Sequence, residues 1–123
     1  MTTILLIGAG GFLGANVRFA IASWSRRRYG PRFPVGTMIA NVAGSFLIGI
    51  ILGMVDDREA RLLLATGFLG AETTFSTFAV ETLGLADRVE RNEAAANVAL
   101  NGVGSMLAVV AGLASAWLLR VAA

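Results

Sequence analysis

The stretch LLLATGFLGAETTFSTFAVETLGLA, residues 62–86, decides how this chain can fold. It is long enough to cross a bilayer, for which a helix needs about 20 mostly apolar residues. Its middle, residues 67–81, is a poor helix interior, because Thr-Thr-Phe-Ser-Thr follows two glycines and hydroxyl side chains compete for the backbone hydrogen bonds. A break inside a membrane is tolerated only where the freed backbone groups line a cavity or bind something, as in ion sites. We therefore predict a membrane helix that is broken near its middle.

The rest of the chain supplies three more apolar stretches, separated by short charged connectors. Of the 123 residues, 56% are hydrophobic and 15% charged, with a mean hydropathy of +0.73; soluble domains have about 25% charged residues. These features predict an all-α membrane protein with a single four-helix transmembrane domain over residues 1–123. The expected helices span roughly residues 4–24, 34–55, 62–86 and 94–119.

The glycines near the start of the chain, in residues 8–14, look like the turn of a dinucleotide-binding site. That reading needs strands alternating with amphipathic helices, whereas apolar residues continue here to Trp24. Gly10 and Gly14 form instead a G-x-x-x-G pair, which lets membrane helices approach closely. A signal peptide is also excluded, because the first residues carry no basic side chain and the apolar run is too long.

The ionisable residues limit which chemistry the protein can perform and how it can be oriented in the membrane. There is no cysteine or histidine, which excludes disulfides, thiolate or imidazole metal sites and histidine acid–base chemistry. All ten basic residues are arginines, most of them in connectors, where solvation is the simplest explanation. Six arginines flank one membrane face and three the other, a positive-inside bias small enough for insertion in both orientations. The six are Arg26, Arg27, Arg28, Arg32, Arg88 and Arg91, and the three are Arg58, Arg61 and Arg120.

Two of the expected helices carry polar side chains four residues apart, so that each set forms one narrow stripe. The stripes are Thr37, Asn41 and Ser45, and Asn97, Asn101 and Ser105. Such residues either join helices by hydrogen bonds, worth about 0.6 kcal/mol each, or line a permeation path. The stripes alone leave both interpretations open.

Three motifs, each on its own expected helix, resemble the signature blocks of the Fluc fluoride channels, in the order typical of that family. The resemblance covers essentially the whole chain, and the Thr-Thr-Phe-Ser-Thr-Phe block is the most specific part of it. The motifs are Gly10-Gly11-x-x-Gly14-Ala15-x-x-Arg18, Gly36-Thr37-x-x-x-Asn41-x-x-Gly44-Ser45-Phe46 and Gly67-Phe68-x-Gly70-x-x-Thr73-Thr74-Phe75-Ser76-Thr77-Phe78.

The resemblance implies a passive channel, not an enzyme, that exports cytoplasmic fluoride through the inner (plasma) membrane of a prokaryote. It implies an antiparallel, dual-topology homodimer with two pores, fluoride and a second copy as partners, and no nucleic acid or organic cofactor. By resemblance, Phe75 and Phe78 are pore phenylalanines and Asn41 the pore asparagine. Gly70 and Thr73 are helix-break residues whose carbonyls hold a structural sodium ion on the dimer axis. The implied hydroxyl positions along the anion pathway are Thr37, Ser76, Thr77 and Ser105.

These residue types suit a small, strongly hydrated anion. An uncompensated ion in a low-dielectric medium costs tens of kcal/mol, so the path must supply hydrogen-bond donors at each step. Amides and hydroxyls do so without a fixed positive charge that would trap the ion. The positive edges of aromatic rings can also contact it, and residues three apart on a helix, such as Phe75 and Phe78, share a face.

Three residues depart from the family pattern. Asn97 aligns with a position that is often tyrosine, Asn101 with a small hydroxyl residue, and Glu72 with an apolar one. A carboxylate at mid-membrane is costly, so Glu72 is expected to be protonated, to pair with Arg18, or to face water. An axial offset of about 9 Å between Glu72 and Arg18 favours a protonated acid or a water-filled vestibule.

Two alternative functions remain to be compared with a channel. A small multidrug-type proton-coupled exporter would place an essential glutamate in the first helix, where this chain has Arg18 and no acid. A non-transporting packing subunit would need the glycines, but not Asn41, Phe75 and Phe78 together.

Overall fold

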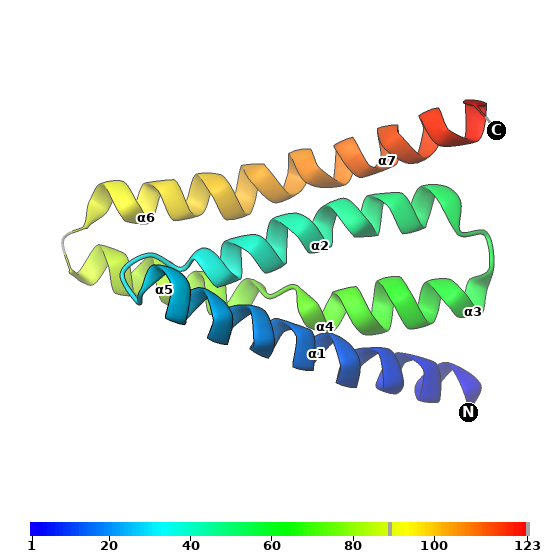
Figure 1. Ribbon diagram of the computed structural model, residues 1–123, viewed down its shortest axis with the longest axis horizontal. Helices are drawn as coiled ribbons and strands as arrows, with labels where there is room; N and C mark the ends of the chain where they lie inside the picture. Colours follow the sequence, from blue (N-terminus) through cyan, green and yellow to red (C-terminus); the bar gives the residue numbers. More distant parts are fainter. Residues whose placement is uncertain (89, 123) are drawn as a thin grey trace.

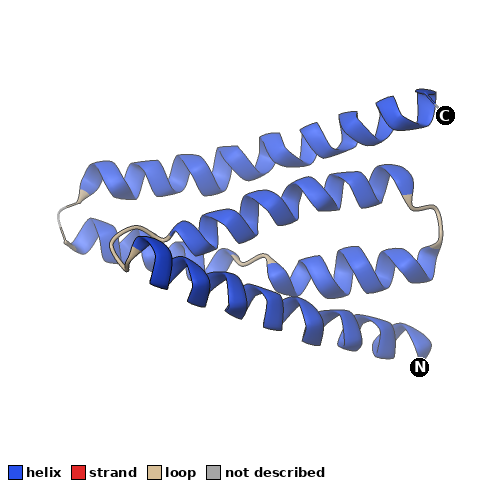
Figure 2. Ribbon diagram, viewed as in Figure 1, coloured by secondary structure: helices blue, strands red, loops and turns tan. Residues whose placement is uncertain are grey.

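The computed structural model describes residues 1–88 and 90–122, and within these every regular element is helical. The elements form four rods that run back and forth (Figures 1 and 2). Both termini lie at the same end of the bundle (Figure 1), as an even number of antiparallel rods requires. The first two rods are α1 (Thr2–Tyr29) and α2 (Val35–Met54). The third consists of α3 (Arg58–Arg61), η1 (Leu62–Leu69), α4 (Gly70–Glu72) and α5 (Phe75–Asp87), and the fourth of α6 (Arg91–Val98), η2 (Ala99–Val103) and α7 (Gly104–Ala122).

The surface of this bundle is that of a membrane protein. Three rods are long and apolar enough to cross a bilayer, namely Thr2–Tyr29, Val35–Met54 and Arg91–Ala122. Large apolar side chains point outward, and Phe12, Leu107 and Trp117 are each more than half exposed. A soluble protein rarely exposes so much contiguous apolar surface, whereas lipid accommodates it.

Three rods are longer than the sequence predicts, and the third rod of the chain spans Arg58–Asp87 instead of residues 62–86. The first continues past residue 24 to Tyr29, because the arginines of its last turn favour the negative end of the helix dipole. Gly30 ends it in a left-handed conformation (φ 79°), just before Pro31. The fourth rod spans Arg91–Ala122 instead of residues 94–119.

The third rod contains a break, at Thr73 and Thr74. Both residues have extended backbone angles, with ψ values of 155° and 123°. Thr74 then caps α5, since its Oγ1 accepts a hydrogen bond from the Thr77 amide at 3.3 Å. Gly70, expected to be a break residue, is itself helical (φ −63°, ψ −29°). Hydroxyl side chains that bond locally, and not the glycine, therefore stop this helix.

Glycines bring the rods into backbone contact. A Cβ on Gly10 of α1 would lie 2.8 Å from the Phe68 amide nitrogen, and one on Gly67 of η1 would lie 2.8 Å from the Ile7 carbonyl. On the other side of the bundle, a Cβ on Gly49 of α2 would lie 2.9 Å from the Leu113 amide nitrogen of α7. Such distances leave no room for a methyl group, so Gly10 and Gly14 near the start of the chain serve helix packing.

Candidate functional site

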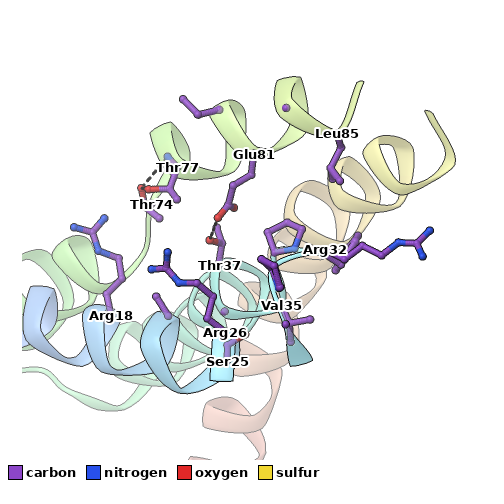
Figure 3. Close-up of a pocket in the computed structure, with 18 of the residues that line it drawn as sticks. Arg18, Ser25, Arg26, Arg32, Val35, Thr37, Thr74, Thr77, Glu81 and Leu85 are labelled. Carbon is purple, nitrogen blue, oxygen red and sulfur yellow. Dashed lines mark hydrogen bonds between the residues drawn. The ribbon is translucent and has the colours of Figure 1, made fainter. Parts of the chain in front are cut away.

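Two cavities meet at the break in the third rod, and Thr74 lines both of them. The smaller one, of about 370 Å³, lies between α2, the break and the fourth rod, and its lining side chains are uncharged. The larger one, of about 800 Å³, lies among α1, α2 and α5 and is shown in Figure 3. The smaller cavity is lined by Asn41, Ser45, Gly70, Thr73, Thr74, Phe75, Phe78, Asn101, Gly102 and Ser105.

The buried side chain of Asn41 in α2 compensates the broken backbone. Its Oδ1 accepts a hydrogen bond from the Thr74 amide at 2.8 Å, and its Nδ2 donates to the Thr74 carbonyl at 3.0 Å. The second hydrogen of Nδ2 is donated to Oδ1 of Asn101 at 2.9 Å. Asn41 therefore replaces the acceptor that the Thr74 N–H loses at the break and gives the Thr74 carbonyl a side-chain donor.

The smaller cavity combines two phenylalanine rings with a free hydroxyl. Phe75 and Phe78 lie edge to face, with ring centroids 5.6 Å apart and planes inclined by 61°. Phe75 is 79% exposed. On the opposite wall, Ser105 has a buried Oγ with no hydrogen-bond partner among the described residues. A hydroxyl in that state can donate to an anion that enters the cavity.

The two asparagines of the polar stripe in the fourth rod join helices by hydrogen bonds, which is one of the two interpretations given above. Nδ2 of Asn101 donates to Oδ1 of Asn97 at 2.8 Å, and Nδ2 of Asn97 donates to Oγ1 of Thr82 at 2.8 Å. Thr82 donates in turn to the Phe78 carbonyl at 2.8 Å. The two asparagines that depart from the family pattern thus link the fourth rod to α2 and α5.

The larger cavity has an electropositive lining. Four arginines line it, together with a single carboxylate, Glu81, whose Oε1 accepts a hydrogen bond from Oγ1 of Thr37 at 2.9 Å. Figure 3 shows Arg18 and Arg26 on α1, across from the Thr37–Glu81 pair. Three of these four arginines come from segments that we expected to be merely solvated. The four are Arg18, Arg26, Arg32 and Arg88.

The structure distributes the expected site residues over these two cavities. Asn41, Phe75, Phe78 and Ser105 lie together in the smaller cavity. Thr37 and Thr77 line the larger one. Ser76 is exposed, with its Oγ 3.3 Å from Oγ1 of Thr74. Gly70 and Thr73, the expected sodium ligands, line the smaller cavity.

Sequence reasoning missed the roles of Thr74, Glu81 and Thr82. For Thr74 a signal existed, because a threonine at the start of a resumed helix is a typical N-cap. Glu81 and Thr82 fall in a regular helical stretch, and nothing in their local sequence indicates their partners on α2 and α6.

Glu72 does not face the larger cavity. It is only 4% exposed, and its Oε2 has no hydrogen-bond partner among the described residues. The carboxylate lies against Gly44 of α2, where a Cβ would collide with it. The expected water-filled vestibule is therefore wrong for this residue, because the bundle buries it. No arginine within residues 1–88 and 90–122 forms an ion pair with it inside 4.0 Å, which leaves the protonated acid as the standing prediction.

Comparison with known proteins identifies the family. The family model described as "CrcB-like protein, Camphor Resistance (CrcB)" matches residues 5–113. A protein named fluoride-specific ion channel FluC, from Rhizobium meliloti (strain 1021), is 42% identical, with 93% of this chain and 95% of that protein covered. A FluC from Rhizobium leguminosarum bv. trifolii (strain WSM2304) is 44% identical with the same coverage. FluC 2 of Bacillus thuringiensis subsp. konkukian (strain 97-27) is 47% identical over 72% of this chain and 75% of its own. On the strength of these matches, the chain belongs to the CrcB/FluC family of fluoride-specific ion channels.

Proposed function

We propose that this chain is a passive, fluoride-specific channel in which the two cavities form successive parts of one anion pathway. The observation that carries this proposal is their meeting at Thr74, with arginines on one side and uncharged donors on the other. Anions collect in the larger cavity because its guanidinium groups outnumber its carboxylate. They pass on through the smaller cavity, where no fixed positive charge retains them.

Within the smaller cavity, several groups of the chain can replace the water that fluoride loses. Ser105 supplies a hydroxyl that has no other partner, and Phe75 and Phe78 supply ring edges. Asn41 supplies an N–H that now points to Asn101. A charged acceptor forms a hydrogen bond roughly twice as strong as a neutral one, so fluoride can compete with the Asn101 carbonyl for that hydrogen.

The same pathway accounts for export. No proton-coupling histidine is present, and a passive pore needs none. Hydrogen fluoride crosses membranes, dissociates in a less acidic cytoplasm and is trapped there as the anion. The negative-inside potential then drives fluoride out, with about 2.3 kcal/mol per charge per 100 mV. In this proposal the channel lies in the plasma membrane of a prokaryote.

The functional unit in this proposal is an antiparallel homodimer. Phe75 lines the smaller cavity yet is 79% exposed in the single chain, so a second copy is needed to enclose that part of the pathway. The six-to-three arginine distribution permits both orientations in the membrane. Accessibility labelling of a terminal tag should therefore find it on both sides of the membrane, and a single orientation would contradict the dimer.

The residues at the break fit a structural sodium ion. In a continuous helix the Thr74 amide would donate to the Gly70 carbonyl, but here it donates to Asn41. The Thr77 amide would donate to the Thr73 carbonyl, but here it donates to Oγ1 of Thr74. Gly70 and Thr73 thus have carbonyls released from the helical ladder, and carbonyl oxygens are suitable ligands for a hard cation. Bound sodium would neutralise these dipoles where two copies meet.

The exporter alternative lacks its central residue, since α1 has no carboxylate. The packing-subunit alternative does not explain a buried, unpartnered Ser105 hydroxyl beside two phenylalanines. Efflux measurements on purified protein in liposomes loaded with fluoride or chloride distinguish the channel, the exporter and the packing subunit. Rapid fluoride efflux with valinomycin, little chloride efflux and no dependence on a proton gradient are expected. Efflux that requires a proton gradient would support an exporter, and no efflux a packing subunit.

A further inference from the structure

We propose that Asn101 is a positioning residue of the anion pathway, which fixes the orientation of the Asn41 amide and is itself fixed by Asn97 and Thr82. This inference rests on the proposed channel function. Asn101 lines the smaller cavity beside Asn41, and their side chains are joined by a 2.9 Å hydrogen bond.

The hydrogen-bond chain has only one possible direction. It ends at the Phe78 carbonyl, which can only accept, so the Thr82 hydroxyl must donate to it and accept from Nδ2 of Asn97. Oδ1 of Asn97 is then turned toward Asn101, whose Nδ2 donates to it at 2.8 Å. Oδ1 of Asn101 is consequently turned toward Asn41 and accepts from it.

The other end of the hydrogen-bond chain, at Thr74, requires the same direction. The Thr74 amide can only donate, and its partner is Oδ1 of Asn41 at 2.8 Å. Nδ2 of Asn41 must therefore face Asn101. Because both ends agree, the Asn41 amide has one orientation in which every partner is satisfied. Turning it over would place Oδ1 against the Thr74 carbonyl and Nδ2 against the Thr74 N–H.

Burial limits the access of water to the three asparagines of this hydrogen-bond chain. Asn97 is 0% exposed and Asn101 is 4% exposed, and Asn41 is also buried. An amide that loses its partner in such a place stays unsatisfied, which is costly in a low-dielectric interior. Removing one side chain from the hydrogen-bond chain therefore also weakens the hold on Asn41 and on the Thr74 peptide.

This arrangement gives Asn101 a role in permeation beyond holding helices together. Both hydrogens of Asn41 Nδ2 are in use, one on the Thr74 carbonyl and one on Oδ1 of Asn101. Asn101 keeps the second hydrogen directed along the wall of the cavity that contains Phe75 and Phe78. When an anion accepts that hydrogen, Asn101 keeps its own hydrogen bond to Asn97 and stays in place. Nδ2 of Asn41 can therefore donate to Oδ1 of Asn101 again once the anion has left.

The test compares two variants of similar size, Asn101→Ser and Asn101→Cys. A serine hydroxyl can accept from Asn41 and donate to Asn97, whereas a thiol does both only weakly. We expect Asn101→Ser to keep fluoride efflux from liposomes within about threefold of wild type and Asn101→Cys to lower it about tenfold, the effect of one lost hydrogen bond. Asn92→Cys, at an exposed site near the start of α6, controls for the thiol itself.

Hydrogen exchange of the Thr74 amide gives a readout that does not depend on transport. It should be faster in Asn101→Cys than in wild type or Asn101→Ser, because Asn41 is then less well held. Equal efflux and equal exchange for the two variants, both folded by size-exclusion chromatography, would overturn the proposal. If wild-type protein moves no fluoride, the proposed function fails, while the exchange comparison still decides whether Asn101 orients Asn41.

Discussion

The Asn41 side chain is hydrogen-bonded to both backbone groups of Thr74, with its Oδ1 2.8 Å from the Thr74 nitrogen and its Nδ2 3.0 Å from the Thr74 carbonyl oxygen. One residue of α2 thus replaces the helical acceptor that the Thr74 N–H loses at the break and also donates to the Thr74 carbonyl. The break, the pathway and the sodium-binding carbonyls of the proposed channel all depend on this contact. It makes Asn41 both a structural residue and a donor.

Replacing Asn41 with aspartate should abolish fluoride efflux. The carboxylate keeps the contact with the Thr74 amide, but it loses the donors to the Thr74 carbonyl and to Asn101, and it repels the anion. Fluoride-electrode recordings from proteoliposomes measure the effect. Asn92→Asp, at an exposed position outside the smaller cavity, should conduct like wild type. Normal efflux through Asn41→Asp would mean that the pathway runs elsewhere.

Phe75→Ile and Phe78→Ile should fold normally and conduct more slowly. Apolar volume is roughly kept, but the positive ring edge is lost, and we expect a fall in fluoride efflux of about tenfold for each. Phe12→Ile is the matched control, because Phe12 lies on α1 with 70% exposure, outside both cavities. If the three variants show the same efflux, ring edges do not contribute to permeation.

Ser105→Ala should lower fluoride efflux without lowering stability. The Ser105 Oγ is buried and has no partner among the described residues, so its removal costs no internal hydrogen bond, while the anion loses a donor. Ser115→Ala, which removes a hydroxyl that donates to the Ala111 carbonyl at 2.8 Å, should leave efflux unchanged. Thermal unfolding in detergent and liposome efflux are measured together. A stability loss in Ser105→Ala would show that the hydroxyl has a structural partner.

Glu72→Gln should preserve the dimer and leave fluoride efflux at least as high as in wild type. The side chain is buried against Gly44, and no arginine of residues 1–88 and 90–122 pairs with it within 4.0 Å; glutamine has the same shape as the neutral acid. Efflux assays at several sodium concentrations and size-exclusion chromatography provide the readouts. Loss of sodium dependence, or dissociation in detergent, would instead make Glu72 a structural part of the helix break.

The pair formed by Asp56 and Arg120 should give a small, acid-sensitive contribution to stability. The Arg120 guanidinium donates to Asp56 at 2.6 Å and thereby lowers the pKa of that carboxyl below its ordinary value of 3.8. Because the folded-state pKa is the lower one, the contribution is present above pH 3.8 and is lost as the pH falls below it. The unfolding temperatures of wild type and Asp56→Asn should therefore differ at pH 7 and approach each other at a pH below 3.8. An equal difference at both pH values would contradict this role.

The sequence by itself determined the membrane class, the four helical rods, the position of the break within residues 67–81 and the family, because these depend on apolar length and local backbone preference. It also indicated the packing role of Gly10 and Gly14, since small residues at this spacing are useful only where helices touch. Tertiary structure alone decided that Thr74 meets Asn41, that arginines of the first rod and of the connectors line one cavity, and that Glu72 is buried. These facts depend on how each helix is rotated and shifted along its neighbours, which close packing of the whole bundle sets and no single helix encodes.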